Sequence, residues 1–220
     1  IKKINEYGYQ VWPQGILKLL NIKYFILPGP LINHELYKDL GVKKMYYFGN
    51  NKIYNGTMVD VNIYKYTDFY NRLFFTNSIK YVNQEDMYAN ILLDNYDPAH
   101  TIYVNNPDVI NQNFENSGRY VEIIKWEADK IQFKTKTQSD QFLVISEIYY
   151  PNGWTVSSNS TEYKIYEVNN LVRGIFIPKG ENEFVMSFDP YDLRIGKLIS
   201  FISYILVLSL ILLYSWKERL

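Results

Sequence analysis

Three groups of carboxylates are the residues in this sequence whose types and spacing suit acid–base chemistry. They are Glu85 with Asp86, Asp94 with Asp97, and Asp189 with Asp192. Each group also has a structural explanation, because acidic residues favour the first turn of a helix and Asp favours tight turns. We find no His or Cys that partners any of them in a catalytic arrangement. We therefore predict no catalytic residue among these carboxylates.

Metal and cofactor chemistry find little support in the sequence. It contains no Cys and two His, His34 and His100, which lie far apart and lack ligand spacing. The missing Cys excludes disulfides, thiolate metal sites and Cys nucleophiles, and a lone His is more often structural than a ligand. The net charge at pH 7 is zero, so no overall basic field attracts nucleic acid. We expect no metal, no cofactor and no nucleic-acid partner.

A different kind of chemistry is suggested by three large aromatic residues around a corner of the chain. Tyr149 and Tyr150 precede residues 151–153, which read Pro-Asn-Gly, and Trp154 follows them. Exposed aromatic rings at the edge of a β-structure commonly stack on sugar rings. The alternative is that they close the end of a hydrophobic core or rest at a membrane interface, and the residues alone favour that alternative.

The elements that position this corner read as a series of short strands. The chain is rich in aromatic residues, with 22 Tyr, which favours β-structure. Seven short strands within about 70 residues, separated by turn signals, indicate an antiparallel β-sandwich. The expected strands cover residues 120–126, 130–137, 141–149, 154–157, 162–168, 171–177 and 183–188.

The part before the sandwich mixes helices and strands. Short helices are expected after Pro13, from Asn33 to Gly41 and over residues 84–93. Strands are expected at residues 22–27, 45–48, 52–54, 59–64, 73–82 and 101–104, with hairpin turns at residues 49–51 and 55–56. Residues 94–118 otherwise read as loop, and we place a domain boundary there.

The C-terminal segment carries the strongest physical signal. Residues 198–216 form an apolar run of 19 residues without charge, long enough as a helix to span roughly 28 Å, close to the hydrocarbon thickness of a bilayer. We predict a transmembrane helix. Positive residues flank both ends, Arg194 and Lys197 before it and Lys217 and Arg219 after it, so charge alone leaves its orientation open.

The aromatic corner and its surroundings resemble a known family. Residues 142–154 read Phe-Leu-Val-Ile-Ser-Glu-Ile-Tyr-Tyr-Pro-Asn-Gly-Trp and are similar to a stretch of the YfhO-like bacterial membrane proteins. In that family Pro-Gly-Trp is usual, so Asn152 is an insertion, and Ser158-Asn159-Ser160 stands where the next turn usually has Asp-Gly. Further similar segments are residues 19–26, 71–75, 163–180, 188–190 and 194–196.

The resemblance implies a large polytopic membrane protein related to GT-C glycosyltransferases. Such enzymes take a sugar from a polyprenyl-phosphate carrier and transfer it outside the cell, in some relatives onto polymers of the teichoic-acid type. Their catalytic acid lies in an early loop that this sequence does not contain, so no catalytic residue is carried over. The resemblance also implies an orientation, with the domain outside and Lys217 and Arg219 inside. Since the chain begins at Ile1 without Met or a signal peptide, we expect further membrane segments before it.

These observations predict a mainly β protein with some α structure, in four parts. They are an α+β extracytoplasmic subdomain at residues 1–118, an antiparallel β-sandwich at 119–190, a transmembrane helix at 195–216 and a cytoplasmic tail at 217–220. We expect a non-catalytic extracytoplasmic module of a membrane glycosyltransferase, partnered by the bilayer, by the rest of its own membrane domain and by a cell-surface glycan or polymer. The candidate substrate or acceptor contacts are Tyr149, Tyr150, Trp154, Arg72 and Arg173.

The two arginines are candidates because guanidinium groups pair with phosphate or carboxylate on a polymer. An internal ion pair or simple packing is the alternative role for both. At the level of the whole chain, the alternatives are a membrane-tethered carbohydrate-binding or structural module with no enzyme activity, and a tail-anchored cytosolic protein.

Overall fold

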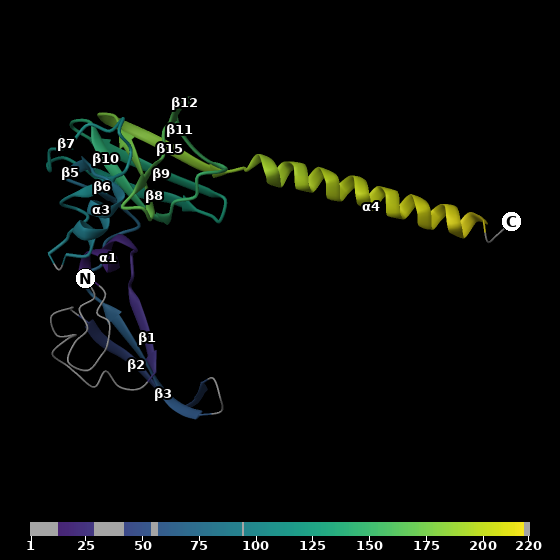
Figure 1. Ribbon diagram of the computed structural model, residues 1–220, viewed down its shortest axis with the longest axis horizontal. Coiled ribbons are helices and arrows are strands. Elements are labelled where there is room, and N and C mark those ends of the chain that lie inside the picture. Colours follow the sequence, from purple (N-terminus) through teal and green to yellow (C-terminus); the bar gives the residue numbers. More distant parts are fainter. Residues whose placement is uncertain (1–12, 29–41, 54–56, 94, 218–220) are drawn as a thin grey trace.

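Two antiparallel sheets lie face to face and form the predicted sandwich (Figure 1). The computed structural model describes residues 13–28, 42–53, 57–93 and 95–217. One sheet has the order β12-β11-β15-β9-β8. Its strands are β8 (Tyr120–Trp126), β9 (Lys130–Thr137), β11 (Trp154–Ser158), β12 (Thr161–Tyr163) and β15 (Gly180–Phe188). The other has the order β13-β14-β10-β4, with β4 (Leu73–Phe75), β10 (Gln141–Ile148), β13 (Tyr166–Val168) and β14 (Val172–Ile177).

The core between these sheets follows from alternation along the strands. In β9, Ile131 and Phe133 are buried while Lys134 and Lys136 face solvent, as expected for a sheet with one wet face. Phe133 stacks on Phe184 of the neighbouring strand β15 at 5.2 Å between ring centroids. The residues of this core are Leu73, Phe75, Ile131, Phe133, Leu143, Ile145, Val156, Ile175, Ile177, Phe184 and Met186.

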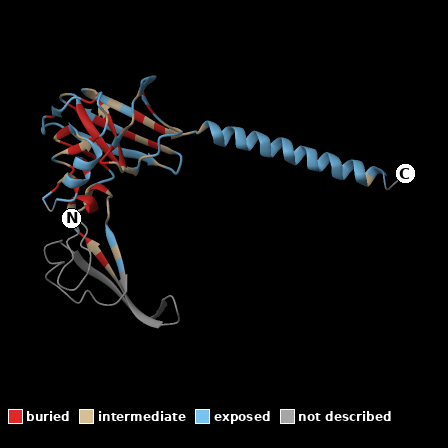
Figure 2. Ribbon diagram, viewed as in Figure 1, coloured by how far each residue is buried: buried red, intermediate tan, exposed pale blue. Residues whose placement is uncertain are grey.

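Strand β10 is buried on both faces, because a third layer of the fold covers the face that points away from the sandwich core (Figure 2). Leu143 and Ile145 face the sandwich core, whereas Phe142 and Val144 belong to a second core. That second core lies against a small sheet with the order β6-β5-β7, formed by β5 (Ser78–Tyr81), β6 (Ile102–Val104) and β7 (Gln112–Asn113). Helices α1 (Gln14–Leu19) and α3 (Gln84–Ile91) complete this part. Strand pairing between β4 and β10 and a shared core therefore join the residues on either side of the boundary expected at residues 94–118.

A three-stranded arm extends away from the sandwich, with the order β1-β3-β2 (Figure 1). Its strands are β1 (Tyr24–Pro28), β2 (Val42–Ile53) and β3 (Thr57–Tyr66). The hairpin turn predicted at residues 49–51 is wrong, because β2 continues through it with a register shift between Phe48 and Asn51. A bulge absorbs the extra residues there without reversing the chain. The helix expected from Asn33 to Gly41 and the turn at residues 55–56 lie outside the described residues.

Two further strand predictions are corrected in detail. The strand expected at residues 73–82 is split into β4 and β5, which belong to different sheets, and the one expected at 162–168 is split into β12 and β13. The turn between β11 and β12 keeps its hairpin geometry despite the missing Asp-Gly. Asn159 and Ser160 both have positive φ, 48° and 66°, which is what a two-residue hairpin turn requires.

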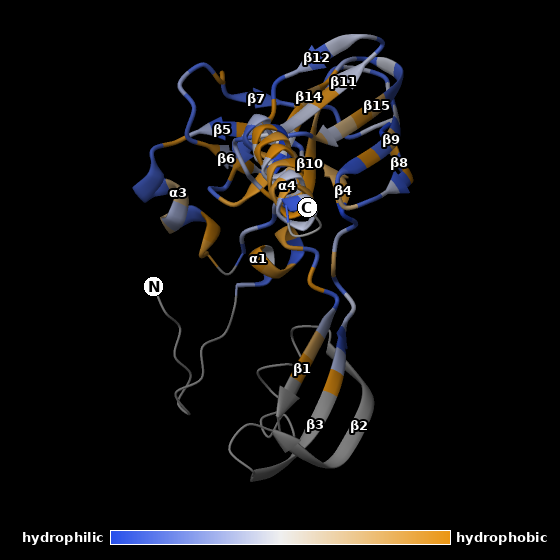
Figure 3. Cartoon of the chain, turned by 90° about the vertical axis from the view of Figure 1, so that its right-hand side faces the viewer, coloured by the Kyte–Doolittle hydropathy of each residue, from blue (hydrophilic) through white to orange (hydrophobic). Residues whose placement is uncertain are grey.

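The C-terminal helix α4 (Tyr191–Lys217) leaves the sandwich and has no buried side chain (Figure 2). Most of its length is hydrophobic (Figure 3). Its 27 residues are long and apolar enough to cross a membrane. The helix begins four residues earlier than the span predicted at residues 195–216, because residues 191–194, which include Asp192 and Arg194, belong to the same helix.

Candidate functional site

All five predicted contact residues lie at or close to one end of the sandwich, the end from which α4 leaves. Arg72 precedes the start of β4, Tyr149 and Tyr150 follow the end of β10, and Trp154 and Arg173 lie near the starts of β11 and β14. The chain reaches α4 from the same end, because Phe188, the last residue of β15, is paired with Trp154. Antiparallel pairing places these strand ends together. The structure thus gathers residues that are up to 101 positions apart, from 72 to 173.

Arg173 is almost fully buried, with 5% of its surface exposed. Its guanidinium stacks over the indole of Trp154, with Cζ 4.2 Å from the ring centroid, and its Nε donates a hydrogen bond to the carbonyl of Ile148 at 3.1 Å. Burial lowers the pKa of Arg173, and the negative charge of Glu147 opposes this effect. Among the described residues its Nη1 has no hydrogen-bond partner. Arg173 therefore holds the corner together and is a buried charge with unused donor capacity.

Arg72 forms a second arginine–tryptophan pair at the same end. Its Cζ lies 4.7 Å from the ring centroid of Trp126, and its Nη1 forms an ion pair with Glu147 Oε1 at 2.9 Å. The side chain is about half exposed, at 49%. One carboxylate therefore serves two guanidinium groups, which leaves this set of residues with an excess of positive charge. We call Arg72, Trp126, Glu147, Trp154 and Arg173 the Arg–Trp cluster.

The bulge in β10 explains how Glu147 reaches this position. The register of β10 against β14 shifts between Ile145 and Ile148, so that residues 146 and 147 lie outside the regular ladder. Ser146 is held there by two hydrogen bonds, from its N–H to the carbonyl of Arg72 at 2.8 Å and from its hydroxyl to the carbonyl of Leu19 at 2.7 Å. The next side chain, Glu147, pairs with Arg72, and its charge acts on Arg173.

The three aromatic residues of the corner have different environments. Trp154 and Tyr150 both pack against Phe188, at 5.3 Å and 6.1 Å between ring centroids. Trp154 is half-buried, but Tyr150 is 53% exposed. Tyr149 is half-buried, and its N–H bonds to the carbonyl of Leu171 at 2.8 Å. Tyr150 is thus the ring of the corner most accessible to a ligand.

The corner is fixed to the beginning of α4 by close contacts. The N–H of Asp189 donates to the carbonyl of Gly153 at 2.8 Å, and Asp189 pairs with Arg194 in the first turns of the helix, with 2.8 Å from Arg194 Nη2 to Oδ2. The charge-free run begins at Leu198, so residues 191–197 separate the sandwich from it. As helix these residues span about 10 Å, comparable with the headgroup layer of a bilayer.

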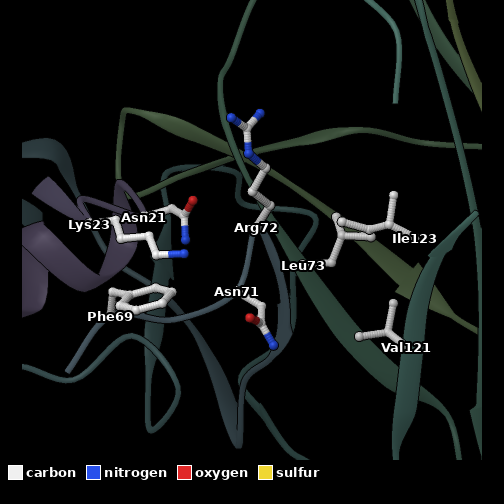
Figure 4. A pocket seen from close by; sticks show the side chains of 8 residues that line it. All are labelled: Asn21, Lys23, Phe69, Asn71, Arg72, Leu73, Val121 and Ile123. Carbon is white, nitrogen blue, oxygen red and sulfur yellow. The ribbon is translucent and has the colours of Figure 1, made fainter. Parts of the chain in front are cut away.

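A groove beside the Arg–Trp cluster was not predicted. Its volume is about 320 Å³, and Figure 4 shows Lys23, Asn21 and Phe69 on one side and the aliphatic side chains of Leu73, Val121 and Ile123 on the other. Arg72 and Asn71 lie between these two walls. The lining residues come from the root of the arm, from the segment before β4 and from β8, so no local sequence pattern could reveal them. We call this site the basic groove.

Three of the carboxylates that suited acid–base chemistry, Asp86, Asp97 and Asp189, are occupied by structural contacts. Asp97 accepts hydrogen bonds from the Tyr70 hydroxyl at 2.7 and 2.8 Å, and Asp189 pairs with Arg194. Glu85 and Asp86 lie in the first turn of α3, where Asp86 N–H bonds to the side chain of Asn83 at 2.8 Å. Asp94 and His34 lie outside the described residues. Within the described part of the chain, no three His, Asp or Glu side chains come together as a metal site would require.

Comparison with known proteins identifies a family. The family model described as bacterial membrane protein YfhO matches residues 33–200. No curated protein and no solved structure matches the chain. The matched range includes β2 to β15, the Arg–Trp cluster and the first ten residues of α4.

Proposed function

This chain belongs to the bacterial membrane protein family YfhO, whose model covers residues 33–200 of its 220, and we propose that it is the C-terminal extracytoplasmic module of a polytopic, glycosyltransferase-like membrane protein. The family and the exposed apolar helix α4 make it a membrane protein. In the proposed role, the module does not catalyse transfer. It holds a cell-surface polymer while a sugar is moved onto it from a polyprenyl-phosphate carrier by another part of the protein.

One observation carries this proposal. Every candidate contact residue lies at or beside the end of the sandwich that faces α4, although these residues come from four separate segments of the chain. A lipid-linked sugar reacts at the membrane surface, so a module that holds the acceptor must present its binding groups toward that surface. The seven helical residues 191–197 separate the sandwich end from the charge-free run by about 10 Å, so this end lies close to the membrane surface in the proposed arrangement.

The contacts at this end suggest a division of roles. Tyr150 and Arg72 are exposed and offer an aromatic face and a cation to a passing polymer. Trp154 and Arg173 are packed against each other and against the corner, so they act as positioning residues for Tyr150 and Glu147. Tyr149 is tied to Leu171 by its backbone and supports the same corner.

Sugar transfer by the full-length protein tests the proposal. We expect the double variant Tyr150→Ala with Arg72→Gln to lower kcat/KM for transfer to the surface polymer at least about tenfold, because each change removes a contact of roughly 1–2 kcal/mol. Tyr120→Ala is the matched control, since Tyr120 is exposed to the same extent, 54%, at the far end of β8. Unchanged transfer by the folded double variant would contradict the proposed role.

A further inference from the structure

The basic groove has an uneven distribution of charge. Lys23 Nζ lies over the ring of Phe69 at 5.0 Å and near the ring of Tyr24 at 5.8 Å, and it pairs with no carboxylate of the described residues. Among the described residues, Arg72 pairs with one carboxylate, that of Glu147, and the negative charge of Glu147 also acts on Arg173. The groove is therefore bordered by two cations whose charge is compensated only in part. An anionic group placed there gains charge-assisted hydrogen bonds.

The opposite wall of the groove is aliphatic. Ile123 is 38% exposed on β8, which is the edge strand of the five-stranded sheet, and Leu73 and Val121 line the groove beside it. A ligand that has an apolar face as well as a negative charge therefore complements both walls of the groove.

Amide groups add a third kind of contact. Asn71 lines the groove, and its side chain has no hydrogen-bond partner among the described residues. Asn21 also lines it, with its amide N–H donated to the carbonyl of Tyr70 and its side-chain oxygen left to accept. Amides both donate to and accept from hydroxyl groups.

We propose that the basic groove binds one anionic sugar unit, with a carboxylate or phosphate held by Lys23 and Arg72. The hydroxyls of the sugar are matched by Asn71 and Asn21, and its C–H face by Ile123 and Val121. A cavity of about 320 Å³ is at the small end of ligand sites, which suits a single ring better than a long acyl chain. This inference rests on the proposed function, because it assigns the chemistry of the polymer that the module holds.

Equilibrium binding of small probes to the full-length protein in detergent tests the inference. Glucuronate and glucose 1-phosphate are the probes. Glucose, which has the sugar ring without the charge, and inorganic phosphate, which has the charge without the ring, are the controls. We expect both anionic sugars to bind saturably, and each control to bind at least about tenfold more weakly, since each control lacks one set of contacts. No saturable binding of either anionic sugar up to about 10 mM would overturn the inference, as would phosphate binding as tightly as glucose 1-phosphate.

Two matched pairs of variants locate the site. Lys23→Gln should weaken binding of the anionic sugars about tenfold or more, while Lys164→Gln, which removes a lysine 5.1 Å from the ring of Tyr166 and outside the groove, should leave it unchanged. Ile123→Glu adds a negative charge to the groove and should weaken binding at least as much. Ile124→Glu places the same charge on the next residue of β8, which is exposed and does not line the groove. Equal effects within either pair would overturn the assignment.

The outcomes separate this inference from the proposed function. If the anionic sugars do not bind but the Tyr150→Ala and Arg72→Gln changes reduce transfer, the groove inference fails and the proposed function stands. If the sugars bind in the groove but the full-length protein transfers no sugar, the groove inference stands and the proposed function fails. Binding of anionic phospholipid vesicles that is lost in Lys23→Gln, without any sugar binding, would assign the groove to a lipid headgroup and overturn the inference.

Discussion

The guanidinium of Arg173 lies over the indole of Trp154, with 4.2 Å between Cζ and the ring centroid. Because Trp154 also packs on Phe188 at 5.3 Å, this contact links β14, β11 and the segment that leads into α4. Arginine suits such a position better than lysine, since its planar group stacks on a ring while its Nε still donates a hydrogen bond. The pair therefore couples the core of the sandwich to the membrane helix.

Replacing Arg173 by Lys should lower the free energy of unfolding by about 2 kcal/mol. The substitution removes the stacked guanidinium and the hydrogen bond from Nε to the carbonyl of Ile148, while it leaves a buried positive charge. Thermal or urea unfolding of the protein in detergent measures the change.

Arg194→Lys is the control for this substitution. Arg194 forms an exposed ion pair with Asp189, and exposed pairs contribute at most about 1 kcal/mol. A loss of stability at Arg173 no larger than that at Arg194 would contradict the coupling role of the stacked pair.

Gly153→Ala should destabilise the corner more strongly than Gly180→Ala. Both glycines have a positive φ, 99° and 109°, so both substitutions carry backbone strain of about 1–2 kcal/mol. A Cβ at Gly153 would also lie 2.7 Å from Cβ of Pro190, whereas nothing lies within 4 Å of one at Gly180. The extra loss at Gly153, about 1–3 kcal/mol, measures how tightly the corner is packed on the start of α4. Equal losses in unfolding experiments would show that this contact is absent in solution.

Alkaline pH should destabilise the protein through tyrosines at the root of the arm. Burial and the charges of Asp68 and Asp97 raise the pKa of Tyr66 from 10.0 to about 12. The folded state thus retains a proton that the unfolded chain releases. The stabilising effect is complete below about pH 10 and is lost as the pH rises toward 12. Burial and the hydrogen bond to Asp97 also raise the pKa of Tyr70, so Tyr70 contributes to the same loss of stability at alkaline pH.

Tyr66→Phe tests this account of the alkaline range. The Tyr66 hydroxyl is buried and has no hydrogen-bond partner in the described part of the chain, so its removal should raise stability by about 1 kcal/mol at pH 8. The fall in stability between pH 10 and 12 should become smaller, but it should not vanish while Tyr70 remains. A variant that is less stable at pH 8 and has the wild-type pH dependence would contradict the environment described for Tyr66.

The sandwich was readable from the sequence because its strands alternate in a simple way. In residues 130–134, apolar residues occupy every second position, and short turns separate the strands that follow. The apolar run at residues 142–145 also signals a strand buried on both faces, although the third layer that covers it could not be identified. That layer is the sheet β6-β5-β7, and each of its strands has only two to four residues. Such a short strand carries too little pattern to be assigned to a sheet.

The candidate site was predictable in part. The aromatic corner was recognised from local spacing. The position of Arg173 in the apolar sequence Val-Arg-Gly-Ile-Phe-Ile is consistent with its burial. The partners of the arginines could not be inferred, because Trp126 and Glu147 join the cluster only through the register of β8 and the bulge in β10. The basic groove escaped notice for the same reason, since Lys23, Arg72 and Ile123 lie about 50 residues apart in sequence and meet only in the folded chain.

The side of the membrane on which the sandwich lies tests the proposed role most directly, because a surface polymer can reach the module only from outside. The chain has no Cys, so single cysteines can be introduced at Glu162, which is exposed on β12, and at Lys217, the last residue of α4. Any cysteine elsewhere in the full-length protein is replaced first. In intact cells treated with a membrane-impermeant maleimide, we expect labelling of Glu162→Cys, and labelling of Lys217→Cys only after permeabilisation. Labelling of Lys217→Cys but not of Glu162→Cys in intact cells would contradict an extracytoplasmic module.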